Sequence, residues 1–401
     1  MQRIPLTEGK TNAVMQVAQQ AGLPEVDGYA ENLDAMLATT ADLWPERPNA
    51  QVKLQTSGNV AGVAVKTHFE KTSHEPEQPD HRTCRPQDFP ERPGTENSPA
   101  FEVLEVPGGY LMLIDHAPVV LTPTLDRIVS DFSSRYAGLV HAYDFDMRRV
   151  LADARTIEGA ALVLCDDVQP INYAHWLLDE LPRLAFLGEN RDLHVVVAAR
   201  MVPFQIETLR LCGFAPERIV MLKDFSAVQA RRLLVSRDVR AMPHPAFKAA
   251  GWAVRFLRDR ILPGGDSEPG TRLYISRADS AGRYVVNEEE LMAVLGPLGY
   301  RRVTLAERSV ADQATLFAGA SHIVGLHGSG FANLVFARKG AQVIEIFART
   351  YGTPAFYVIA AAVGCRYATY VAEKVVGGKR TQVDDVRIDV TNFEKACKHL
   401  L

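Results

Sequence analysis

The amino-acid sequence predicts an α/β protein with two Rossmann-like domains facing a cleft, preceded by an N-terminal extension. The first observation is that short apolar runs alternate with helical patterns from about residue 98 onwards. The second is a break in this alternation at Pro263-Gly264-Gly265, which is followed by "DSEPG". Strand–helix alternation is typical of a mostly parallel sheet covered by helices on both faces. We therefore predict domains over residues 98–265 and 266–401.

The extension, residues 1–97, differs in composition from the rest of the chain. Residues 10–45 carry apolar positions that suit one or two helices. From residue 56 to residue 100 the composition shifts to Pro, Glu, His, Thr and Ser, with six prolines between Pro76 and Pro99. Such a segment predicts a loop or linker without a core of its own.

Individual elements follow from the local pattern. Apolar runs predict strands in the first block at 102–106, 110–115, 161–166, 193–199, 218–222 and 231–236, and a helix at 244–262. In the second block we expect strands at 272–277, 301–305, 322–326 and 341–347. Asn287, with Glu290 three residues later, resembles a capping box, and Ser309 is a second N-cap candidate for a helix running to about Ala320.

Composition excludes several classes of protein. A formal net charge of −4 gives no electrostatic case for a nucleic-acid partner. No apolar run approaches the roughly 18–20 residues that span a bilayer, and the first residues lack a signal-peptide pattern. The five cysteines are scattered and form no CxxC, which argues against a disulfide framework or a structural zinc site. We expect a reducing, cytoplasmic compartment.

The glycine-rich turn between residues 321 and 347 is the most informative segment. A buried strand is expected to end at Leu326, and His327-Gly328-Ser329-Gly330 turns directly into a helix. Glycines let backbone N–H groups approach a ligand, and a helix N-terminus favours phosphate. The next strand is expected to end near Glu345, whose carboxylate would accept hydrogen bonds from ribose hydroxyls. This predicts a nucleotide site, although a tight turn beside a solvated glutamate fits the spacing equally well.

Two arginines are expected at the same end of the sheet as this turn. Arg277 lies just after a predicted strand, and Arg283 follows in the loop. Guanidinium groups bind a diphosphate in a bidentate manner. Arginines are also common on surfaces, so either residue alone is weak evidence for a diphosphate site. Their expected position at the same end of the sheet as Gly328 and Gly330 makes the pair stronger evidence.

A polar cluster interrupts the apolar helix pattern of "PINYAHWLLDELPRL". His175 and Asp179 are four residues apart, so on a helix they share one face. Either could act as a general base, with the other orienting it, and the sequence leaves open which one moves the proton. The alternative is a polar pair on a solvated face. Asp144 and Asp146 form a DxD, which arises easily by chance in a chain this rich in aspartate.

Together these segments resemble glycosyltransferase family 61, in its bacterial capsular-polysaccharide type. "NYAHWLLDELPRL" resembles the family's N-x-x-H-x-x-x-D block through Asn172, His175 and Asp179. "RLYISRADSAGRYVVNEEEL" resembles its arginine block. "IVGLHGSGFANLVFARKGAQVIEIF" resembles its glycine-turn block through His327, Gly328, Ser329, Gly330, Asn333 and Glu345, with Ser329 where alanine is usual. The resemblance spans about residues 160–347.

This resemblance implies a GT-B architecture and an inverting, metal-independent transfer from a nucleotide-sugar without a cofactor. His175 or Asp179 would deprotonate the acceptor, with Asn172 on the acceptor side. The glycine-turn residues, Arg277 and Arg283 would bind the donor. The expected acceptor is a polysaccharide, lipid-linked oligosaccharide or related glycan, with peripheral association at the inner face of the membrane.

Two other functions stay open. An NAD-dependent oxidoreductase would use "GSGFAN" as a variant of GxGxxG, with Asn333 in place of the third glycine. A non-catalytic nucleotide-sugar-binding protein would need neither His175 nor Asp179.

Overall fold

The computed structural model describes part of the 401-residue chain in enough detail for structural statements. The described residues are 49, 51, 53–69, 72–74, 83–84, 96–98, 101–133, 137–143, 145–165, 172–190, 192–236, 251–262, 264, 270–348, 352–353, 355–375, 385–398 and 400–401. The helices expected within residues 10–45 lie outside them. None of the helices in the described ranges is long and apolar enough to cross a membrane.

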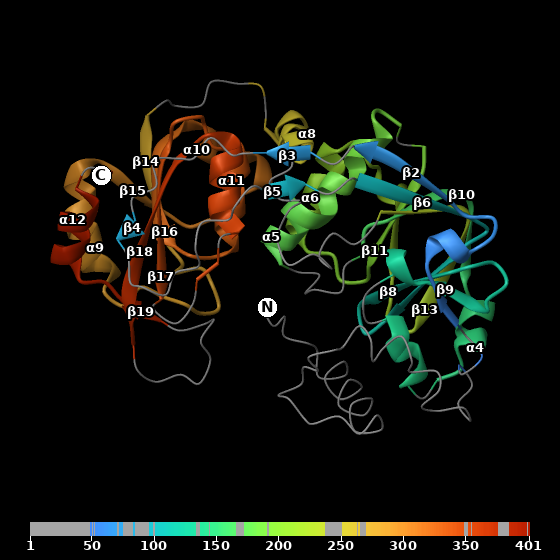
Figure 1. Ribbon diagram of the computed structural model, residues 1–401. Helices are drawn as coiled ribbons and strands as arrows, with labels where there is room; N and C mark the ends of the chain where they lie inside the picture. The colour runs from blue at the N-terminus through green and yellow to red at the C-terminus, as the bar shows by residue number, and fades with distance from the viewer. Residues whose placement is uncertain are drawn as a thin grey trace. The chain divides into compact units, whose positions relative to one another are not determined.

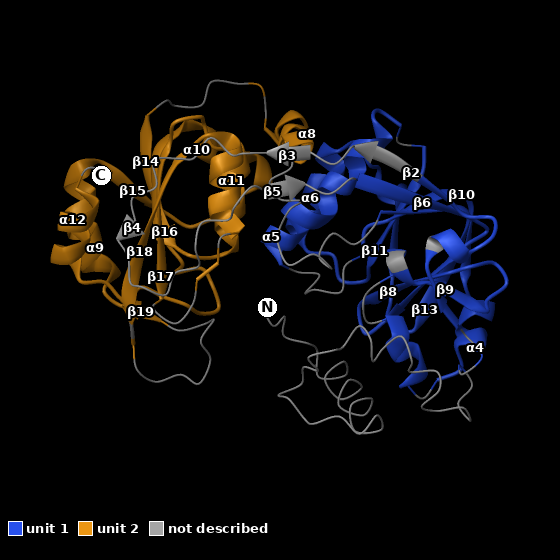
Figure 2. Cartoon of the chain, viewed as in Figure 1, with its two compact units in different colours: residues 1–71, 99–244 blue, residues 72–98, 245–401 orange. Residues whose placement is uncertain are grey.

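The chain forms two compact units (Figure 2). Unit 1 comprises residues 1–71 and 99–244, and unit 2 comprises residues 72–98 and 245–401. The chain crosses between the units at 98/99, near the predicted boundary at residue 98, but unit 2 also includes residues 72–98 and resumes at residue 245, before the predicted boundary near 265. One reason is backbone pairing, because the Pro-rich segment supplies strands that pair with strands from later in the chain. The other is helix packing, because the helix before residue 265 packs on unit 2.

Unit 1 is built around one mixed sheet. Its strands are β1 (Lys53–Gln55), β2 (Ala64–Phe69), β6 (Phe101–Pro107), β7 (Tyr110–Ile114), β8 (Ala117–Leu121), β9 (Arg127–Val129), β10 (Arg155–Val163), β11 (His194–Ala198), β12 (Ile219–Leu222) and β13 (Ser226–Ser236). They follow the order β1-β9-β8-β7-β13-β10-β11-β12, and β6 pairs with β13 and β2. Strands β10 to β13 pair in parallel, whereas β6, β7 and β8 make antiparallel ladders. The expected mostly parallel sheet is therefore correct for only part of unit 1.

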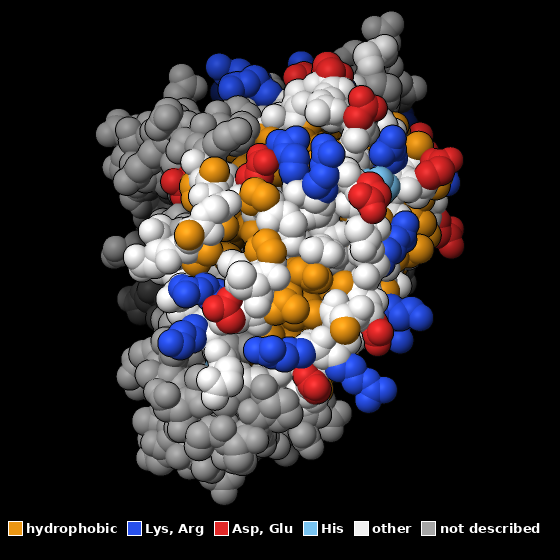
Figure 3. Space-filling model, turned by 90° about the vertical axis from the view of Figure 1, so that its right-hand side faces the viewer, with side chains coloured by type: hydrophobic (Ala, Val, Ile, Leu, Met, Phe, Trp, Pro, Cys, Tyr) orange, Lys and Arg blue, Asp and Glu red, His pale blue; other side chains and the backbone are white. Residues whose placement is uncertain are grey.

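Short helices flank this sheet. They are η1 (Ser57–Asn59), η2 (Ser130–Phe132), η3 (Ala137–His141), α4 (Met147–Ala152), α5 (Tyr173–His175), η4 (Trp176–Glu180), η5 (Leu181–Leu187), α6 (Pro203–Leu211) and η6 (Pro216–Arg218). Asp146 of the predicted DxD is the N-cap of α4, because its carboxylate accepts from two backbone N–H groups of the first turn. Its partner Asp144 lies outside the described residues. On the face of the molecule in Figure 3, acidic and basic side chains are interspersed around a central hydrophobic group.

Unit 2 contains a parallel sheet of the doubly wound kind. Its strands are β14 (Thr271–Ile275), β15 (Tyr300–Val303), β16 (Ala320–Leu326), β17 (Gln342–Ala348), β18 (Arg366–Lys374), β19 (Val386–Arg387) and β4 (Thr83–Cys84). The order is β15-β14-β16-β17-β18, with β4 and β19 on the far side of β18. The strands β3 (Thr72–His74) and β5 (Glu96–Ser98) form a separate antiparallel pair. In the order of the chain, the five parallel strands read 2-1-3-4-5.

Helices cover both faces of this sheet, as predicted (Figure 1). They are α8 (Gly251–Ile261), α9 (Glu288–Leu295), η8 (Gly296–Leu298), α10 (Val310–Gly319), η9 (Ser329–Phe336), α11 (Ala355–Val363) and α12 (Val390–Cys397). The helices α9 and α12 pack on one face, around a core that includes Tyr274, Leu291 and Phe393. On the other face α8, α10 and α11 surround η9. Arg258 of α8 donates to the carbonyls of Val335 and Ala337, which fixes α8 to unit 2.

Candidate functional site

The strand order of unit 2 contains a point where the chain reverses its direction of winding. In a 2-1-3-4-5 sheet this point lies between the first and third strands, here β14 and β16. Ligands of open α/β sheets bind outside the carboxyl ends of the strands at such a point. The residues that follow β14 and β16 are Arg277 and the His327–Gly330 turn. The predicted donor-binding residues therefore lie where this strand order favours the binding of a ligand.

Arg277 is held in one conformation by the loop that follows it. Its Nε donates to the carbonyl of Arg283 at 2.9 Å, and its Nη2 donates to that of Gly282 at 3.0 Å. Burial, and then the charge of Arg283, lower the pKa of Arg277 to about 10, so it is cationic at neutral pH. Among the described residues Arg277 makes no ion pair. A cation held this way is available to an anionic ligand.

Arg283 joins the arginine loop to the glycine turn. Its Nη1 donates to the carbonyl of His327 at 2.8 Å. Its backbone has φ 65°, a left-handed conformation that is unusual for a residue with a side chain. Such strain persists only where neighbouring contacts hold it, and it is common at ligand sites. Arg277 and Arg283 thus converge on one turn, as predicted.

The glycines of the turn lie against the side chains of Arg277 and Leu305. Gly328 is extended, at φ 178°, and a Cβ atom there would overlap the guanidinium of Arg277. Glycine is needed at 328 because the arginine packs against it. At Gly330, a Cβ would meet the side chain of Leu305 at 2.8 Å. The expected short helix is present as the 3₁₀ helix η9, and Ser329 is its first, half-buried residue.

Asn333 stabilises this turn from inside. It is fully buried, and its Nδ2 donates to Gln313 Oε1 at 2.8 Å and to the carbonyl of Gly330 at 3.1 Å. Gln313 in turn donates to the carbonyls of Leu305 and Arg308. These contacts tie η9 to α10. Gln313 was missed by the sequence reasoning, because a glutamine within an amphipathic helix pattern carries no signal of burial.

Glu345 does not end its strand, contrary to the prediction. The strand β17 continues to Ala348, and the side chain of Glu345 is completely buried. Oε1 of the carboxylate hydrogen-bonds to Nδ1 of His327, and Oε2 accepts from the hydroxyl of Tyr367. The strand was expected to end near Glu345, because a polar residue late in an apolar run is typical of the end of a strand. The geometry favours a role for Glu345 in holding His327.

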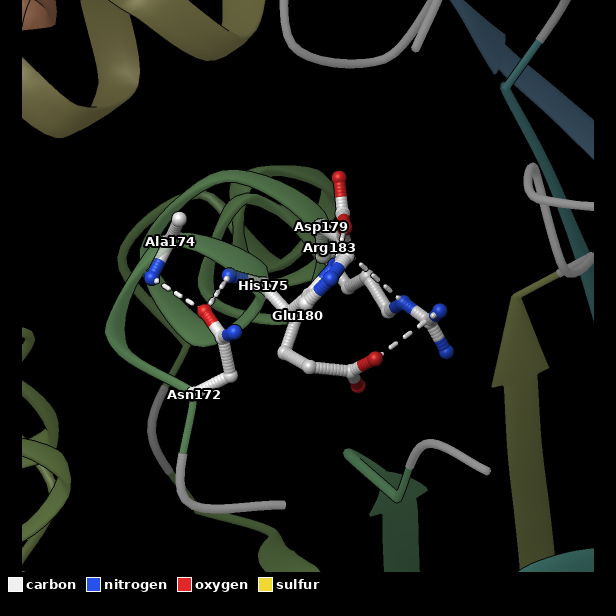
Figure 4. A network of polar contacts seen from close by, with 6 residues as sticks. All are labelled: Asn172, Ala174, His175, Asp179, Glu180 and Arg183. Atoms are coloured by element: carbon white, nitrogen blue, oxygen red, sulfur yellow. Dashed lines mark hydrogen bonds and ion pairs between the residues drawn. The ribbon is translucent and has the colours of Figure 1, made fainter. Parts of the chain in front are cut away.

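The second group of predicted residues lies in unit 1, where α5, η4 and η5 follow each other without a break (Figure 4). Oδ1 of Asn172 accepts from the backbone N–H groups of Ala174 and His175, so Asn172 is the N-cap of α5. The helix then widens into the π-helical turn η4 at Trp176–Glu180. Pro182 explains this widening, because its ring would clash with the carbonyl four residues earlier in a regular α-helix. π-Helical turns are frequent at functional sites.

His175 and Asp179 are in contact, as their spacing predicted. Nδ1 of His175 lies 2.7 Å from Oδ2 of Asp179. The side chain of Asp179 is 5% exposed and that of His175 is 27% exposed, so the imidazole is the member of the pair that reaches solvent. The polar-pair alternative required a solvated carboxylate, and Asp179 is buried. A buried carboxylate on one ring nitrogen orients a histidine as a general base.

Two buried charged residues support the π-helical turn, and no role for them was predicted from the sequence. Nε of Arg183 donates to the carbonyl of Asp179 at 3.0 Å, and its Nη2 lies 3.2 Å from Oε1 of Glu180. Figure 4 shows Arg183 and Glu180 extending beside each other from the helix. Arg183 thereby holds the backbone of the residue that contacts His175.

Comparisons with known proteins give one family and three individual similarities. The chain is 28% identical to the Xenopus tropicalis protein O-linked-mannose beta-1,4-N-acetylglucosaminyltransferase 2 over 96 residues. That match covers 23% of this chain and 17% of the relative, so the chain spans less than a fifth of the length of the curated relative it matches.

Two solved structures of the E. coli glycosyltransferase TibC are also similar. The iron-containing dodecameric enzyme has 12% identity and a TM-score of 0.28, covering 75% of this chain and 89% of the other. The complex with ADP-D-beta-D-heptose has 13% identity and a TM-score of 0.30, covering 75% and 88%. TM-scores this low do not establish a shared fold.

The family comparison covers the two groups of residues described above. It matches a contiguous region that contains the His175–Asp179 pair, both arginines and the whole glycine turn. Asn172 lies immediately before this region and Glu345 immediately after it. Residues 173–344 of the chain match the Glycosyltransferase 61 family.

Proposed function

We propose that the protein is an inverting glycosyltransferase that transfers a sugar from a nucleotide-sugar to a hydroxyl group. The acceptor is a polysaccharide, a lipid-linked oligosaccharide or a related glycan. The observation that carries the proposal is the convergence of Arg277 and Arg283 on the glycine turn, at the winding reversal of the unit 2 sheet. The family match over residues 173–344 supports the same reaction class.

In this proposal the arginines bind the diphosphate of the donor. The bond between the anomeric carbon and the diphosphate oxygen breaks, and negative charge develops on the departing group. Preorganised cations stabilise such charge most effectively when they need not move during the reaction. Arg277 meets this condition because three groups fix its guanidinium: the carbonyls of Gly282 and Arg283, and the backbone of Gly328. Two arginines also supply the positive charge for a metal-independent reaction.

The His175–Asp179 pair activates the acceptor. Asp179 holds Nδ1 of His175, so Nε2 takes the proton from the acceptor hydroxyl as its oxygen attacks the anomeric carbon. Attack opposite to the leaving diphosphate inverts the configuration at that carbon. We assign the base to His175 and the orienting role to Asp179, since only the histidine reaches solvent. A GT-B architecture belongs to this proposal.

We place the reaction in the cytoplasm, at the inner face of the membrane where lipid-linked acceptors are assembled. The thiols of Cys165 and Cys365 are buried and form no disulfide with the described residues, which supports a reducing compartment. The oxidoreductase alternative draws no support from the family match or the curated relative.

A thermal-shift panel on the purified protein tests the donor class. The panel contains UDP, GDP, ADP, CMP, dTDP and NAD, each with and without EDTA. A ligand at 100 times its Kd adds about 2.7 kcal/mol of stability, which is visible as a higher melting temperature. The proposal expects a shift from one nucleotide other than NAD, unchanged by EDTA. A shift from NAD alone would overturn it.

The matching nucleotide-sugar then tests the chemistry. With a glycan acceptor, the enzyme is expected to release the nucleotide and to form a glycoside of inverted anomeric configuration, read from the anomeric coupling in the proton NMR spectrum. A product of retained configuration would contradict the single displacement and the role of His175.

A further inference from the structure

A single carboxylate ties the loop that carries the two arginines to the neighbouring loop of unit 2. Asp279 lies between Arg277 and Arg283 in the sequence. Its Oδ2 accepts hydrogen bonds from the backbone N–H groups of Leu305 and Ala306, at 2.8 and 2.7 Å. Leu305 and Ala306 follow β15, the strand on the opposite side of β14 from the glycine turn. Asp279 therefore joins the loop after β14 to the loop after β15.

The loop after β15 is itself fixed to the glycine turn. A Cβ atom at Gly330 would meet the side chain of Leu305 at 2.8 Å, so the two loops are in contact there. The carbonyl of Leu305 accepts from Gln313, whose Oε1 accepts from Asn333. Gln313 and Asn333 are both buried. The backbone that Asp279 binds is therefore held in place by buried side chains.

Within the arginine loop, a second set of hydrogen bonds holds Arg277. Its guanidinium donates to the carbonyls of Gly282 and Arg283. The hydroxyl of Ser280 donates to the carbonyls of Arg277 and Gly282, which closes the loop into a narrow turn. These bonds fix the guanidinium relative to the loop, and Asp279 fixes the loop relative to β15.

The charge of Asp279 has the opposite effect on an anionic ligand. Burial and the charge of Arg283 lower the pKa of Arg277, and the nearby charge of Asp279 opposes this shift. No ion pair joins Asp279 to Arg277 among the described residues. A carboxylate near a diphosphate repels it, although weakly here because Asp279 is exposed to water. Its hydrogen bonds to the backbone are therefore the contribution through which Asp279 favours binding.

We propose that Asp279 is a positioning residue for the donor diphosphate: its hydrogen bonds to the loop after β15 hold the arginine loop, and with it the guanidinium of Arg277, in the binding conformation. The inference rests on the proposed nucleotide-sugar donor. A loop that is already ordered does not have to be immobilised by the ligand, and this saves part of the binding free energy. Asp279 acts through Arg277, without contact to the donor.

Two substitutions separate the hydrogen bonds of Asp279 from its charge. Both backbone N–H groups bond to the same oxygen, so the single carbonyl oxygen of an asparagine can replace it. Asp279→Asn removes the charge and keeps the acceptor, whereas Asp279→Ala removes both. The two variants have the same net charge, so a difference in affinity between them measures the hydrogen bonds.

The probes are UDP, GDP, ADP and dTDP, and the one that wild type binds most tightly is titrated into each variant by calorimetry. Asp279→Asn is expected to bind as tightly as wild type or up to roughly fivefold more tightly, the effect of removing one exposed like charge. Asp279→Ala is expected to bind roughly 5–10-fold more weakly than wild type, because binding must then order the loop. Equal affinity of the two variants would overturn the proposal.

Asp146→Ala is the matched control for a loss of stability alone. Oδ1 of Asp146 also accepts from two backbone N–H groups, those of Arg148 and Arg149, but it lies in unit 1. Both alanine variants are expected to melt at a lower temperature than wild type, and Asp146→Ala is expected to keep the wild-type Kd. If Asp279→Ala also melted earlier with an unchanged Kd, its role would be structural and the proposal would be wrong.

A double-mutant cycle tests whether Asp279 acts through Arg277. In the Arg277→Met background, the difference in affinity between Asp279→Asn and Asp279→Ala is expected to fall below about twofold, because the group that Asp279 positions is absent. A difference that persists would show that Asp279 acts by another route, against the positioning role. Failure of all four nucleotides to bind wild type is a separate outcome, which would remove the diphosphate site and the proposed function with it.

Discussion

The guanidinium of Arg277 occupies the space that a side chain at Gly328 would need. Two loop carbonyls fix Arg277 from the other side, so it cannot retreat without breaking hydrogen bonds. The requirement for glycine at 328 is therefore set by the arginine, while the conformation of the turn, extended at φ 178°, suits any residue.

Gly328→Ala is expected to displace Arg277 and weaken nucleotide binding by roughly 10–100-fold, the effect of losing a charge-assisted hydrogen bond. Calorimetry measures the change in Kd. Gly296→Ala serves as the control, because a Cβ there meets no atom within 4 Å and the backbone is helical at φ −58°. Unchanged affinity in Gly328→Ala would remove Arg277 from the donor site.

His175→Ala is expected to lower turnover by roughly 10²–10⁴-fold, the usual contribution of a general base. Asp179→Asn should also slow turnover, because Asn cannot hold the charged imidazole that forms on proton transfer. Donor affinity should change little in both, since both residues lie in unit 1 and the proposed donor-binding arginines lie in unit 2. Initial rates and calorimetry give the two readouts, with Glu217→Gln on the surface as the control. Turnover within a few-fold of wild type in both variants would contradict the assignment.

Acid is expected to destabilise the protein partly through His322. Burial and the neighbouring Arg272 lower the pKa of His322 to about 4. Between pH 6.5 and pH 4 the unfolded chain binds more protons here than the folded chain, so stability falls as the pH falls. The free energy of unfolding in urea should drop less between pH 7.5 and pH 5 in His322→Gln than in wild type. An equal drop would show that His322 titrates normally.

Arg183→Met is expected to destabilise the protein by about 3–5 kcal/mol, because it leaves Glu180 buried without its cationic partner. The double variant Glu180→Leu/Arg183→Met should recover most of this loss. Arg232→Met breaks the more exposed pair with Glu105 and should cost about 1 kcal/mol or less. Urea unfolding followed by tryptophan fluorescence measures all three. A loss for Arg183→Met no larger than for Arg232→Met would contradict the structural role of the buried pair.

Local periodicity was enough to predict the first four strands of the parallel sheet of unit 2, whereas β18 and the helices after residue 348 were not predicted. The expected strands at 272–277, 301–305, 322–326 and 341–347 correspond to β14, β15, β16 and β17. The Ser309 cap is confirmed, since its hydroxyl accepts from the N–H of Asp312. Asn287 also precedes its helix, but its side chain instead bonds Glu290 and the backbone of Ile388, 101 residues away.

Contacts between distant segments account for what could not be predicted. The antiparallel ladders of β6 and β7 with β13 join residues more than 100 positions apart, and no local pattern records them. In the sequence, the π-helical turn at Asp179 has the pattern of an ordinary α-helix, because one extra residue per turn barely alters a short apolar pattern. Tyr367 reaches Glu345 only because β18 lies next to β17.

The two units are interleaved along the chain, which constrains how the protein is made. The backbone passes between them at 71/72, 98/99 and 244/245. The strand β4 can pair only after β18, nearly 300 residues later, has left the ribosome. Contacts of such long range slow folding, because the intervening loop must close first. A fragment starting at residue 266 would lack both β4 and α8, so unit 2 needs these earlier segments for its native assembly.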